Sequence, residues 1–491
     1  MITQAIDQNS EKSLSSPFFI LIVLLLGKTM ILGAIITFSH LGLSPDEAQY
    51  WTWSQAIDWG YYSKPPAIAW QIWLTTALLG HSEFGVRLGA LMVGFLLPLA
   101  VYYLAICCKQ SEKQAFWSGI VIAFSPLGVY LSLATTTDGG AIFFLTLAIA
   151  TIVKNIEADE GPNYLLVGGW IFLGALYKWI AFACWPLTFF FLIFFPKMRK
   201  WSIISGVLIS LVALLPSIYW NISHEWATFK HVGSVFIGGK RGNFFALLMA
   251  QVGLLSPMYF FFLIRAFFAL SKENNRPLLF CSAFPMAILI YLGIAIFKKI
   301  QPNWTAYLYS PVSVLISWMA YPRFRFLLHI GTWLSVSLIC FAFIIPDYTF
   351  KQTLGWHALE DILKEIDYDP QTEFLMGNKY QTASLLSFYS PLKKRAYFFN
   401  ISHSRKNQFS YWPQMEDCEK HNTGYFIVLQ SDKETMTYEE HYLQLLKPYF
   451  EDVVYLGIYP LYVTNRSLSK SLSIFKCHGY LGGAPIDQYG Y

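Results

Sequence analysis

A short polar segment near the N-terminus brings together residue types that could catalyse a displacement reaction. Asp46 and Glu47 open the segment, and Lys64 follows within the run YYSKPP at 61–66. A carboxylate can take the proton of an attacking hydroxyl, and a fixed ammonium can stabilise a departing phosphate. The segment therefore predicts a reaction that deprotonates a hydroxyl and expels a phosphate, with Asp46 as the base and Glu47 as its support.

A structural role would account for the same two carboxylates. The run that starts at Pro45 is typical of a short helix, and carboxylates are favoured in the first turn of a helix by its dipole. The following residues are rich in Trp and Tyr, as is typical of a helix at a membrane interface. In the catalytic interpretation, partial burial at the bilayer edge raises the pKa of Asp46 toward the useful range. From these residues alone both interpretations stay open.

Further charged residues fall in other connecting segments. Asp138 ends the run TTTD, where it could belong to the site or begin the next helix as its N-cap. Lys178, Arg241 and Lys299 lie near the ends of apolar runs. Such cations either reach lipid headgroups or bind an anionic ligand, and their number favours the ligand. The spacing of His224 and His231 is not a metal-ligand signature.

The elements that must position these residues are membrane helices. The chain is 55% hydrophobic and only 13% charged, whereas a soluble domain carries about 25% charged residues. Long apolar runs continue to about Pro346, and the sequence then becomes polar. This change predicts a transmembrane domain over residues 1–345 and an exported domain over 346–491. The net charge of +5 is dispersed, so we expect no nucleic-acid partner.

Runs of about 20 apolar residues, the length that crosses a bilayer core, predict about eleven spans. They cover residues 17–39, 84–107, 114–134, 139–153, 164–177, 179–196, 201–220, 244–267, 278–297, 304–320 and 326–345. With the N-terminus inside, most basic loops lie on the cytoplasmic side, as the positive-inside rule favours. An odd number of spans then places the C-terminus outside. Lys28 lies in the middle of the first span, where a charge has either a structural partner or a function.

The polar tail predicts a small α/β domain. A helix around 353–366 precedes strand-like segments near 372–376, 394–399, 424–429 and 452–463. Cys418 and Cys477 both fall in this tail, and they could pair in an oxidising compartment or remain separate. The fold expected overall is therefore a mainly α, polytopic helix bundle with interfacial helices in its first loop and a small exported α/β domain.

An ordered set of motifs carries a family resemblance. SPDEAQYW, YYSKPP, TTTDGG, LYKW, WNISHEW and KIQPNW occur in this order. Together they resemble the polyprenyl-phosphate-sugar transferases of the C-type glycosyltransferase superfamily, in particular the lipid A aminoarabinose and galacturonosyl transferases and the protein O-mannosyltransferases. The resemblance runs from about residue 17 to 345 and more faintly into the tail. It implies an inner-membrane enzyme that takes a sugar from a lipid-phosphate carrier on the periplasmic face.

The resemblance also implies roles for individual residues. Asp46 is expected to be the catalytic base, supported by Glu47. The donor phosphate is expected to be bound by Lys64, Lys178, Arg241 and Lys299. Substrate contacts are expected from Tyr61, Tyr62, Asp138, Asn303 and Trp304.

Two departures from the family pattern weaken any assignment of aminoarabinose as the sugar. Gln49 stands where relatives often have Arg, and Ser63 stands where a Glu, a candidate metal ligand, often precedes the lysine of the KPP motif. We therefore do not infer a metal site from the resemblance, and no cofactor is assigned. A divalent metal remains an alternative.

The function expected from the sequence is transfer of one sugar from a polyprenyl-phosphate donor to an envelope acceptor, such as lipid A, lipopolysaccharide core or protein. Asp46 would act by a single displacement that inverts the sugar carbon. The alternatives are a transporter or flippase of lipid-linked sugars, a lipid-linked glycan ligase, and a membrane scaffold. Internal repeats and midplane charges would favour transport, and we find no repeat.

Overall fold

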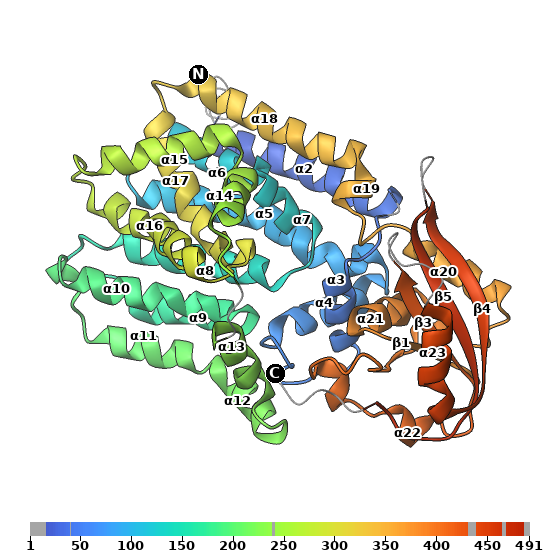
Figure 1. Ribbon diagram of the computed structural model, residues 1–491. Coiled ribbons are helices and arrows are strands. Elements are labelled where there is room, and N and C mark those ends of the chain that lie inside the picture. The colour runs from blue at the N-terminus through green and yellow to red at the C-terminus, as the bar shows by residue number, and fades with distance from the viewer. Residues whose placement is uncertain (1–15, 40, 238–240, 431–437, 464–467, 486–491) are drawn as a thin grey trace, which may run out of the picture.

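The protein consists of a helical bundle and a C-terminal α/β part that packs against one end of it (Figure 1). The computed structural model describes residues 16–39, 41–237, 241–430, 438–463 and 468–485. The fold is thus mainly helical and polytopic, with a small mixed-sheet domain, as the composition predicts.

The helices that are long and apolar enough to cross a membrane are fewer than the eleven predicted. Among the described residues there are six, or up to eight if two bent pairs each count as one span. The six are α2 (Pro17–Phe38), α5 (Glu83–Cys107), α8 (Thr137–Lys154), α11 with α12 (Ser202–Leu211 and Leu214–Ser223), α16 (Arg276–Phe297) and α18 (Arg325–Ile344). The bent pairs are α6 with α7 (Glu112–Phe124 and Pro126–Leu133) and α14 with α15 (Phe244–Leu255 and Pro257–Leu270).

Breaks in the apolar runs explain the lower number. The predicted spans at 164–177 and 179–196 are the short helices α9 (Tyr164–Tyr177) and α10 (Cys184–Leu192), separated at Lys178. A helix of about 14 residues covers about 21 Å, less than the roughly 30 Å of a bilayer core. The run at 244–267 turns by 105°. The run at 304–320 begins as a 3₁₀ segment (Pro302–Leu308) and continues as the 12-residue helix α17 (Tyr309–Ala320).

Lys28 has a structural partner in the bundle. Its ammonium donates to the carbonyls of Gly94, at 3.3 Å, and Ala123, at 3.0 Å. Pro98 lies four residues after Gly94 and has no N–H to bond that carbonyl. Ala123 lies just before the bend between α6 and α7, where the helical ladder is interrupted. Lys28 therefore compensates two backbone acceptors that helix breaks leave open, and it connects three helices.

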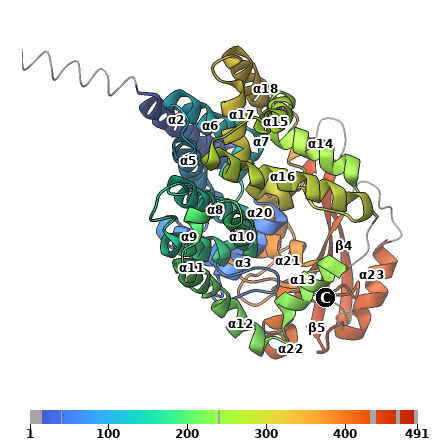
Figure 2. The ribbon, with the colours of Figure 1, turned by 90° about the vertical axis from the view of Figure 1, so that its left-hand side faces the viewer.

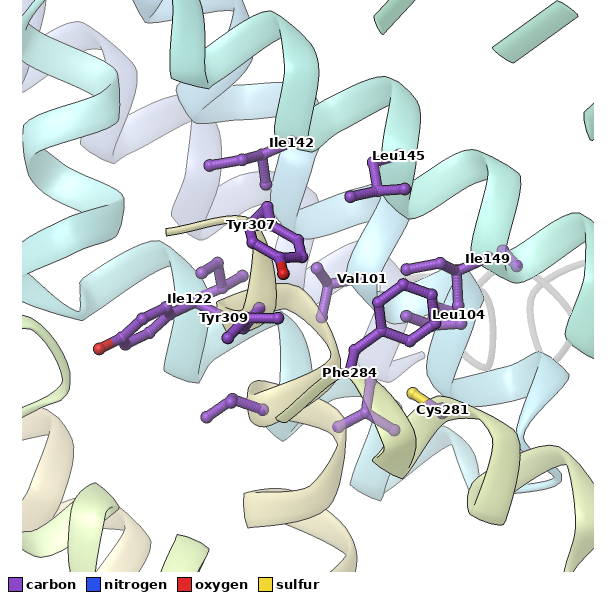
Figure 3. Close-up of a cluster of buried hydrophobic side chains, with 14 of the residues drawn as sticks. Val101, Leu104, Ile122, Ile142, Leu145, Ile149, Cys281, Phe284, Tyr307 and Tyr309 are labelled. Carbon is purple, nitrogen blue, oxygen red and sulfur yellow. The ribbon is translucent and has the colours of Figure 1, made fainter. Parts of the chain in front are cut away.

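The core of the bundle lies where α5, α6, α8, α16 and α17 meet. Figure 3 shows side chains from these helices and from the 3₁₀ segment before α17 packed together, including Val101, Ile142, Phe284 and Tyr307. Their burial removes apolar surface from lipid and fixes the ends of the helices. Tyr307 extends from this core to the wall of a cavity described below.

The first loop contains two helices rather than open coil. The helix α3 (Pro45–Ser54) begins with a capping box, in which the Ser44 hydroxyl accepts from the Glu47 N–H and the Glu47 carboxylate accepts from the Ser44 N–H. Pro45 at the first position is pre-set for a helix. The apolar helix α4 (Ala67–Leu79) follows the two prolines of the YYSKPP run. The local sequence thus fixes where Asp46 and Glu47 lie.

The C-terminal domain is built on a five-stranded sheet of order β2-β1-β3-β5-β4. Its strands are β1 (Phe374–Gly377), β2 (Tyr397–Phe398), β3 (Gly424–Gln430), β4 (Phe450–Val463) and β5 (Leu468–Tyr480). The first three pair in parallel and the last two join antiparallel. The helices are α20 (Leu359–Glu365), α21 (Tyr380–Tyr389), α22 (Met415–Cys418) and α23 (Tyr438–Leu446). Strand β5 was not predicted, and Cys477 within it is a buried free thiol.

The sheet domain contacts the first loop directly. Helix α21 packs on α3, between the bundle and the sheet (Figure 1). The Tyr389 hydroxyl accepts from the Leu43 N–H at 2.6 Å and donates to Glu83 at 3.0 Å. Gly42 makes this approach possible, because a Cβ there would lie 2.4 Å from the Thr353 carbonyl oxygen. The loop that carries Asp46 is therefore held from both sides.

Candidate functional site

A cavity of about 510 Å³ lies among the first loop, α8, α9, α16 and the C-terminal domain. Its polar wall includes Lys64, Asp138, Lys178, Lys298 and Arg405. The rest of its lining is largely apolar and aromatic, with Trp179, Ile180, Val232, Tyr291, Ile294, Ile300, Trp304 and Tyr307. The cavity therefore combines a cationic end with walls suited to a hydrocarbon chain.

A tight turn in the first loop presents Lys64 to this cavity. The Tyr61 N–H donates to the Lys64 carbonyl at 3.2 Å, and the two residues form an isolated bridge. The Thr228 hydroxyl donates to the Tyr61 carbonyl at 3.0 Å, and the Tyr62 N–H donates to Gln408 at 2.7 Å. The turn is thus fixed on one side by α13 (Ala227–Ile237) and on the other by the C-terminal domain.

Asp46 lies next to this cavity and not in its wall. Its side chain is exposed, unlike that of its neighbour Glu47. Partial desolvation raises the pKa of Asp46 above its ordinary value, the charge of Lys64 opposes this rise, and the charge of Glu47 adds to it. Desolvation and the nearby charge of Lys178 lower the pKa of Lys64. Asp46 and Lys64 therefore interact electrostatically, as a base and a phosphate-binding cation in one site would.

Asp138 and Lys178 form an ion pair in the cavity wall. The Lys178 ammonium contacts the Asp138 carboxylate at 2.7 Å, and the side chains are 18% and 13% exposed. Asp138 lies in the first turn of α8, and Lys178 ends α9. The break between the short helices α9 and α10 thus places this cation opposite the first loop.

Glu47 does not face the cavity. It is 1% exposed and accepts hydrogen bonds from Arg87 Nε and NH2, both at 2.8 Å, and from the N–H groups of Ser44 and Thr135. Although burial alone would raise the pKa of Glu47, the Arg87 charge and these hydrogen bonds lower it below the ordinary value. Its position fits the predicted supporting role, and its contacts leave no direct path to a substrate.

The structure separates the other predicted site residues into two groups. Asn303 and Trp304 line the cavity together with Asp138. Tyr61 is fully buried, and its hydroxyl donates to the carbonyls of Trp53 and Ala56. Tyr62 is 4% exposed and packs against the ring of His231. Neither tyrosine belongs to the cavity lining, and both form backbone hydrogen bonds that hold the Lys64 turn.

Two predicted phosphate-binding cations also lie outside the cavity lining. Arg241 and Lys299 are exposed, whereas Lys298, the neighbour of Lys299, lines the cavity. The extended backbone at the end of α16 turns successive side chains to opposite sides. The KK pair in KKIQPNW therefore brings Lys298 to the cavity lining and not the predicted Lys299, and no local pattern distinguishes the two lysines.

Sequence reasoning missed two residues of the cavity. His231 lies on α13, and Arg405 lies in an irregular segment of the C-terminal domain. The Arg405 guanidinium is 2.9 Å from His231 Nδ1. Their meeting depends on tertiary contacts between segments 174 residues apart, for which no local pattern exists.

The donor atoms near the cavity do not form a metal site. Among the described stretches of the chain, no three His, Cys, Asp or Glu side chains are grouped so that they could hold an ion. Glu47 forms an ion pair with Arg87, and Asp138 forms one with Lys178. Ser63 stands before the lysine of the KPP motif, where relatives often have a Glu that could bind a metal. No catalytic step is therefore assigned to a metal.

Comparisons with known proteins confirm the resemblance expected from the motifs. Residues 63–220 match the family described as dolichyl-phosphate-mannose-protein mannosyltransferase. The chain is 28% identical over 313 residues to the lipid A galacturonosyltransferase RgtD of Rhizobium johnstonii, covering 61% of this chain and 65% of that protein. It is 28% identical over 211 residues to an undecaprenyl phosphate-alpha-4-amino-4-deoxy-L-arabinose arabinosyl transferase of Pseudomonas aeruginosa, covering 38% of each.

The fold is shared with a solved structure. The crystal structure of ArnT from Cupriavidus metallidurans bound to undecaprenyl phosphate aligns with a TM-score of 0.62 and 14% identity, and the alignment covers 92% of this chain and 97% of that chain. The matched regions reach at most 65% of the length of the two curated relatives above. The fold similarity thus extends over most of the chain, and the family match covers the segment that contains Lys64, Asp138 and Lys178.

Proposed function

We propose that the chain is a membrane glycosyltransferase that moves one sugar from a polyprenyl-phosphate donor to an envelope acceptor, with lipid A as the first candidate. The active site would face the periplasm of a bacterial inner membrane. The observation that carries this proposal is the cavity, which is lined by Lys64 of the first loop on one side and by apolar side chains elsewhere. The relatives named above act on lipid A or use an undecaprenyl-phosphate sugar, in keeping with such a site.

The lining fits the two ends of the donor. Ile180, Val232 and Ile294 offer an apolar surface to an isoprenyl chain, which remains in contact with the bilayer. Lys64 and Lys298 offer ammonium groups to the phosphate. The sugar would then lie between the phosphate and Asp46, so that its reacting carbon faces the carboxylate of the first loop.

The reaction balances without an acid catalyst. Asp46 takes the proton of the acceptor hydroxyl while that oxygen attacks the anomeric carbon of the sugar. The bond from this carbon to the phosphate oxygen breaks, and its electron pair goes to the phosphate, which leaves as a dianion on the lipid. Fixed cations in a partly desolvated site stabilise this charge as it develops.

Two further features position the reacting groups. The ion pair with Asp138 orients the Lys178 ammonium, whose remaining hydrogens can still donate to a phosphate oxygen. The Glu47–Arg87 pair, together with the Ser44 cap, fixes the first turn of α3 and hence the direction of Asp46. In this proposal Glu47 is a positioning residue and not a catalytic one.

A reconstituted assay tests the proposal. Purified protein in detergent would be incubated with defined polyprenyl-phosphate sugars and lipid A, and the products would be analysed by mass spectrometry and by NMR of the anomeric centre. We expect transfer of one sugar with inversion of configuration. Retention would exclude the single displacement. Absence of transfer from every donor, together with an unchanged set of envelope glycolipids and glycoproteins in cells lacking the protein, would overturn the proposed function.

A further inference from the structure

A segment of the C-terminal domain reaches into the cavity beside the first loop. Gln408, which is 1% exposed, accepts from the Tyr62 N–H at 2.7 Å. Lys406 forms an ion pair with Glu225 at 3.0 Å, at the start of the turn before α13. Figure 2 shows α12 and α13 lying beside this domain. These contacts hold Arg405 at the cavity, where it is part of the lining.

Arg405 is anchored but its charge is not compensated. One guanidinium nitrogen lies 2.9 Å from His231 Nδ1. Burial, together with the charges of Arg405 and Lys64, lowers the pKa of His231 to about 4, so the ring is neutral at pH 7 and Nδ1 accepts the hydrogen bond. Within the described part of the chain, no carboxylate forms an ion pair with Arg405, Lys64 or Lys298. The guanidinium therefore has donors left for a ligand.

The charges around the cavity exceed what the carrier phosphate can neutralise. Four cations line it, namely Lys64, Lys178, Lys298 and Arg405, and two carboxylates, Asp138 in the wall and Asp46 beside it, oppose them. A sugar-linked phosphodiester brings one negative charge and leaves one cation in excess. After transfer the phosphate is a dianion, but Asp46 is then protonated, so the same excess remains. Throughout the reaction one cation is left for another anion.

We propose that Arg405 is a specificity-determining residue that binds a second oxyanion, distinct from the carrier phosphate, on one of the two substrates. This inference rests on the proposed function. The oxyanion is either a carboxylate on the transferred sugar or a phosphate on the acceptor. A planar guanidinium pairs with both groups through two parallel hydrogen bonds, which gives geometric selectivity as well as charge.

The position of Arg405 separates it from the groups assigned to the carrier. Lys64 interacts with Asp46, Asp138 and Lys178, which cluster on the bundle side of the site. Arg405 comes from the C-terminal domain and lies against the neutral His231 ring, 2.9 Å from its Nδ1. A ligand group reaching Arg405 must therefore project toward the C-terminal domain, as a substituent of the sugar or of the acceptor would.

The decisive experiment compares matched substrates with the purified full-length protein. The donors would be polyprenyl phosphates carrying galacturonic acid or galactose, which differ by one carboxylate. The acceptors would be lipid A with its phosphates and lipid A after enzymatic dephosphorylation. kcat/KM would be measured for wild type, Arg405→Ala, Arg405→Lys and the control Lys420→Ala, which removes an exposed cation of the same domain outside the cavity lining.

The expected result is a selective loss. In Arg405→Ala, kcat/KM falls about 10-fold to 100-fold for the substrate that carries the oxyanion, as for loss of hydrogen bonds to a charged group, and stays within about 3-fold for its matched neutral partner. Arg405→Lys keeps the positive charge but cannot form two parallel hydrogen bonds, so its kcat/KM for that substrate lies between those of wild type and Arg405→Ala. Lys420→Ala leaves the preference unchanged. A loss that depends on the sugar carboxylate identifies the donor, and one that depends on the lipid A phosphates identifies the acceptor.

Other outcomes overturn the inference while leaving the proposed function intact. Equal losses on all substrates would place Arg405 on the carrier phosphate or in a structural role. Unchanged rates in Arg405→Ala would remove it from the site. If wild type transfers no sugar from either donor to either acceptor, the second oxyanion is not on these substrates and the inference fails. The proposed function fails only if transfer from every other polyprenyl-phosphate sugar is absent as well, and this result is distinct because it needs no variant.

Discussion

Two groups of charged side chains differ in whether their charges are paired within the protein. Behind the first loop, Arg87 and Glu47 are both 2% exposed or less, and each nitrogen of the guanidinium has a partner, either Glu47 or the carbonyls of Leu41 and Gly42. At the cavity, Lys64 and Arg405 have no carboxylate partner among the residues that the structure describes.

The difference separates charges that build the fold from charges that await a ligand. A buried ion is costly unless it is paired and hydrogen-bonded, so the Glu47–Arg87 pair is complete and inaccessible. A cation held at a cavity without a partner costs free energy in the absence of ligand, and that cost is offset when an anion binds. Asp46 and Glu47 are adjacent in the chain, yet they belong to different sides of this division.

The largest expected effect is on the rate of the Asp46→Asn variant. The amide keeps the shape of the side chain but cannot accept the proton of the acceptor hydroxyl, so kcat/KM should fall about 10²–10⁴-fold. The measurement is the initial rate of sugar transfer in the reconstituted assay. Because Asp46 is exposed, the melting temperature should not change. Wild-type turnover in this variant would remove Asp46 as the base.

The neighbouring substitution Glu47→Ala should act on stability first. It leaves the Arg87 guanidinium buried without its counter-ion, which typically costs about 3–5 kcal/mol. The measurement is thermal unfolding of the purified protein, followed by intrinsic fluorescence, with Asp46→Asn as the matched control one residue away. Equal melting temperatures for the two variants would contradict the distinction between Glu47 as a structural charge and Asp46 as a charge of the active site.

Removing the Lys64 charge should lower the rate but not the stability. Lys64→Met deletes one cation that stabilises the departing phosphate, and loss of one such group typically costs about 10²–10³-fold in kcat. No described carboxylate forms an ion pair with Lys64, so its removal leaves no partner uncompensated. The measurement is kcat together with the melting temperature. A destabilised variant with normal kcat would place Lys64 with the structural charges.

The sequence was informative where local patterns decide the structure. The order Ser44-Pro45-Asp46-Glu47 is that of a capped helix start, and the structure has that cap. A break at Lys178 and an α/β tail were also predicted correctly. Among the described residues, fewer helices than the eleven predicted are long and apolar enough to cross a membrane. An apolar run does not reveal where its helix begins, as at 304–320, where a 3₁₀ segment leaves α17 only 12 residues long.

Residues that meet only in the tertiary structure were not predictable in the same way. Tyr61 was expected at a substrate, but its ring stacks on Trp53 at 4.7 Å, because aromatic residues at an interface can equally be packing residues. Arg405 lies in a segment without periodicity, and the Gln408 contact beside it joins residues 346 apart in the chain. Strand β5 mixes Ser and Lys with apolar residues, and its place in the sheet depends on antiparallel pairing with β3 on one edge and β4 on the other.

The smallest expected effect is a shift in the pH dependence of the rate. Catalysis needs the Asp46 carboxylate, so kcat/KM should fall as the pH drops through the pKa of Asp46, which lies above that of an ordinary aspartate because of desolvation. Lys64 lowers this pKa, so Lys64→Gln should raise it and move the acidic limb to higher pH. The shape of the profile is independent of the absolute rate and can be measured in a slow variant, with Lys420→Ala as the control. A shift to lower pH, or no shift, would mean that Lys64 does not act on the base, and the cavity cations would then bind phosphate without tuning Asp46.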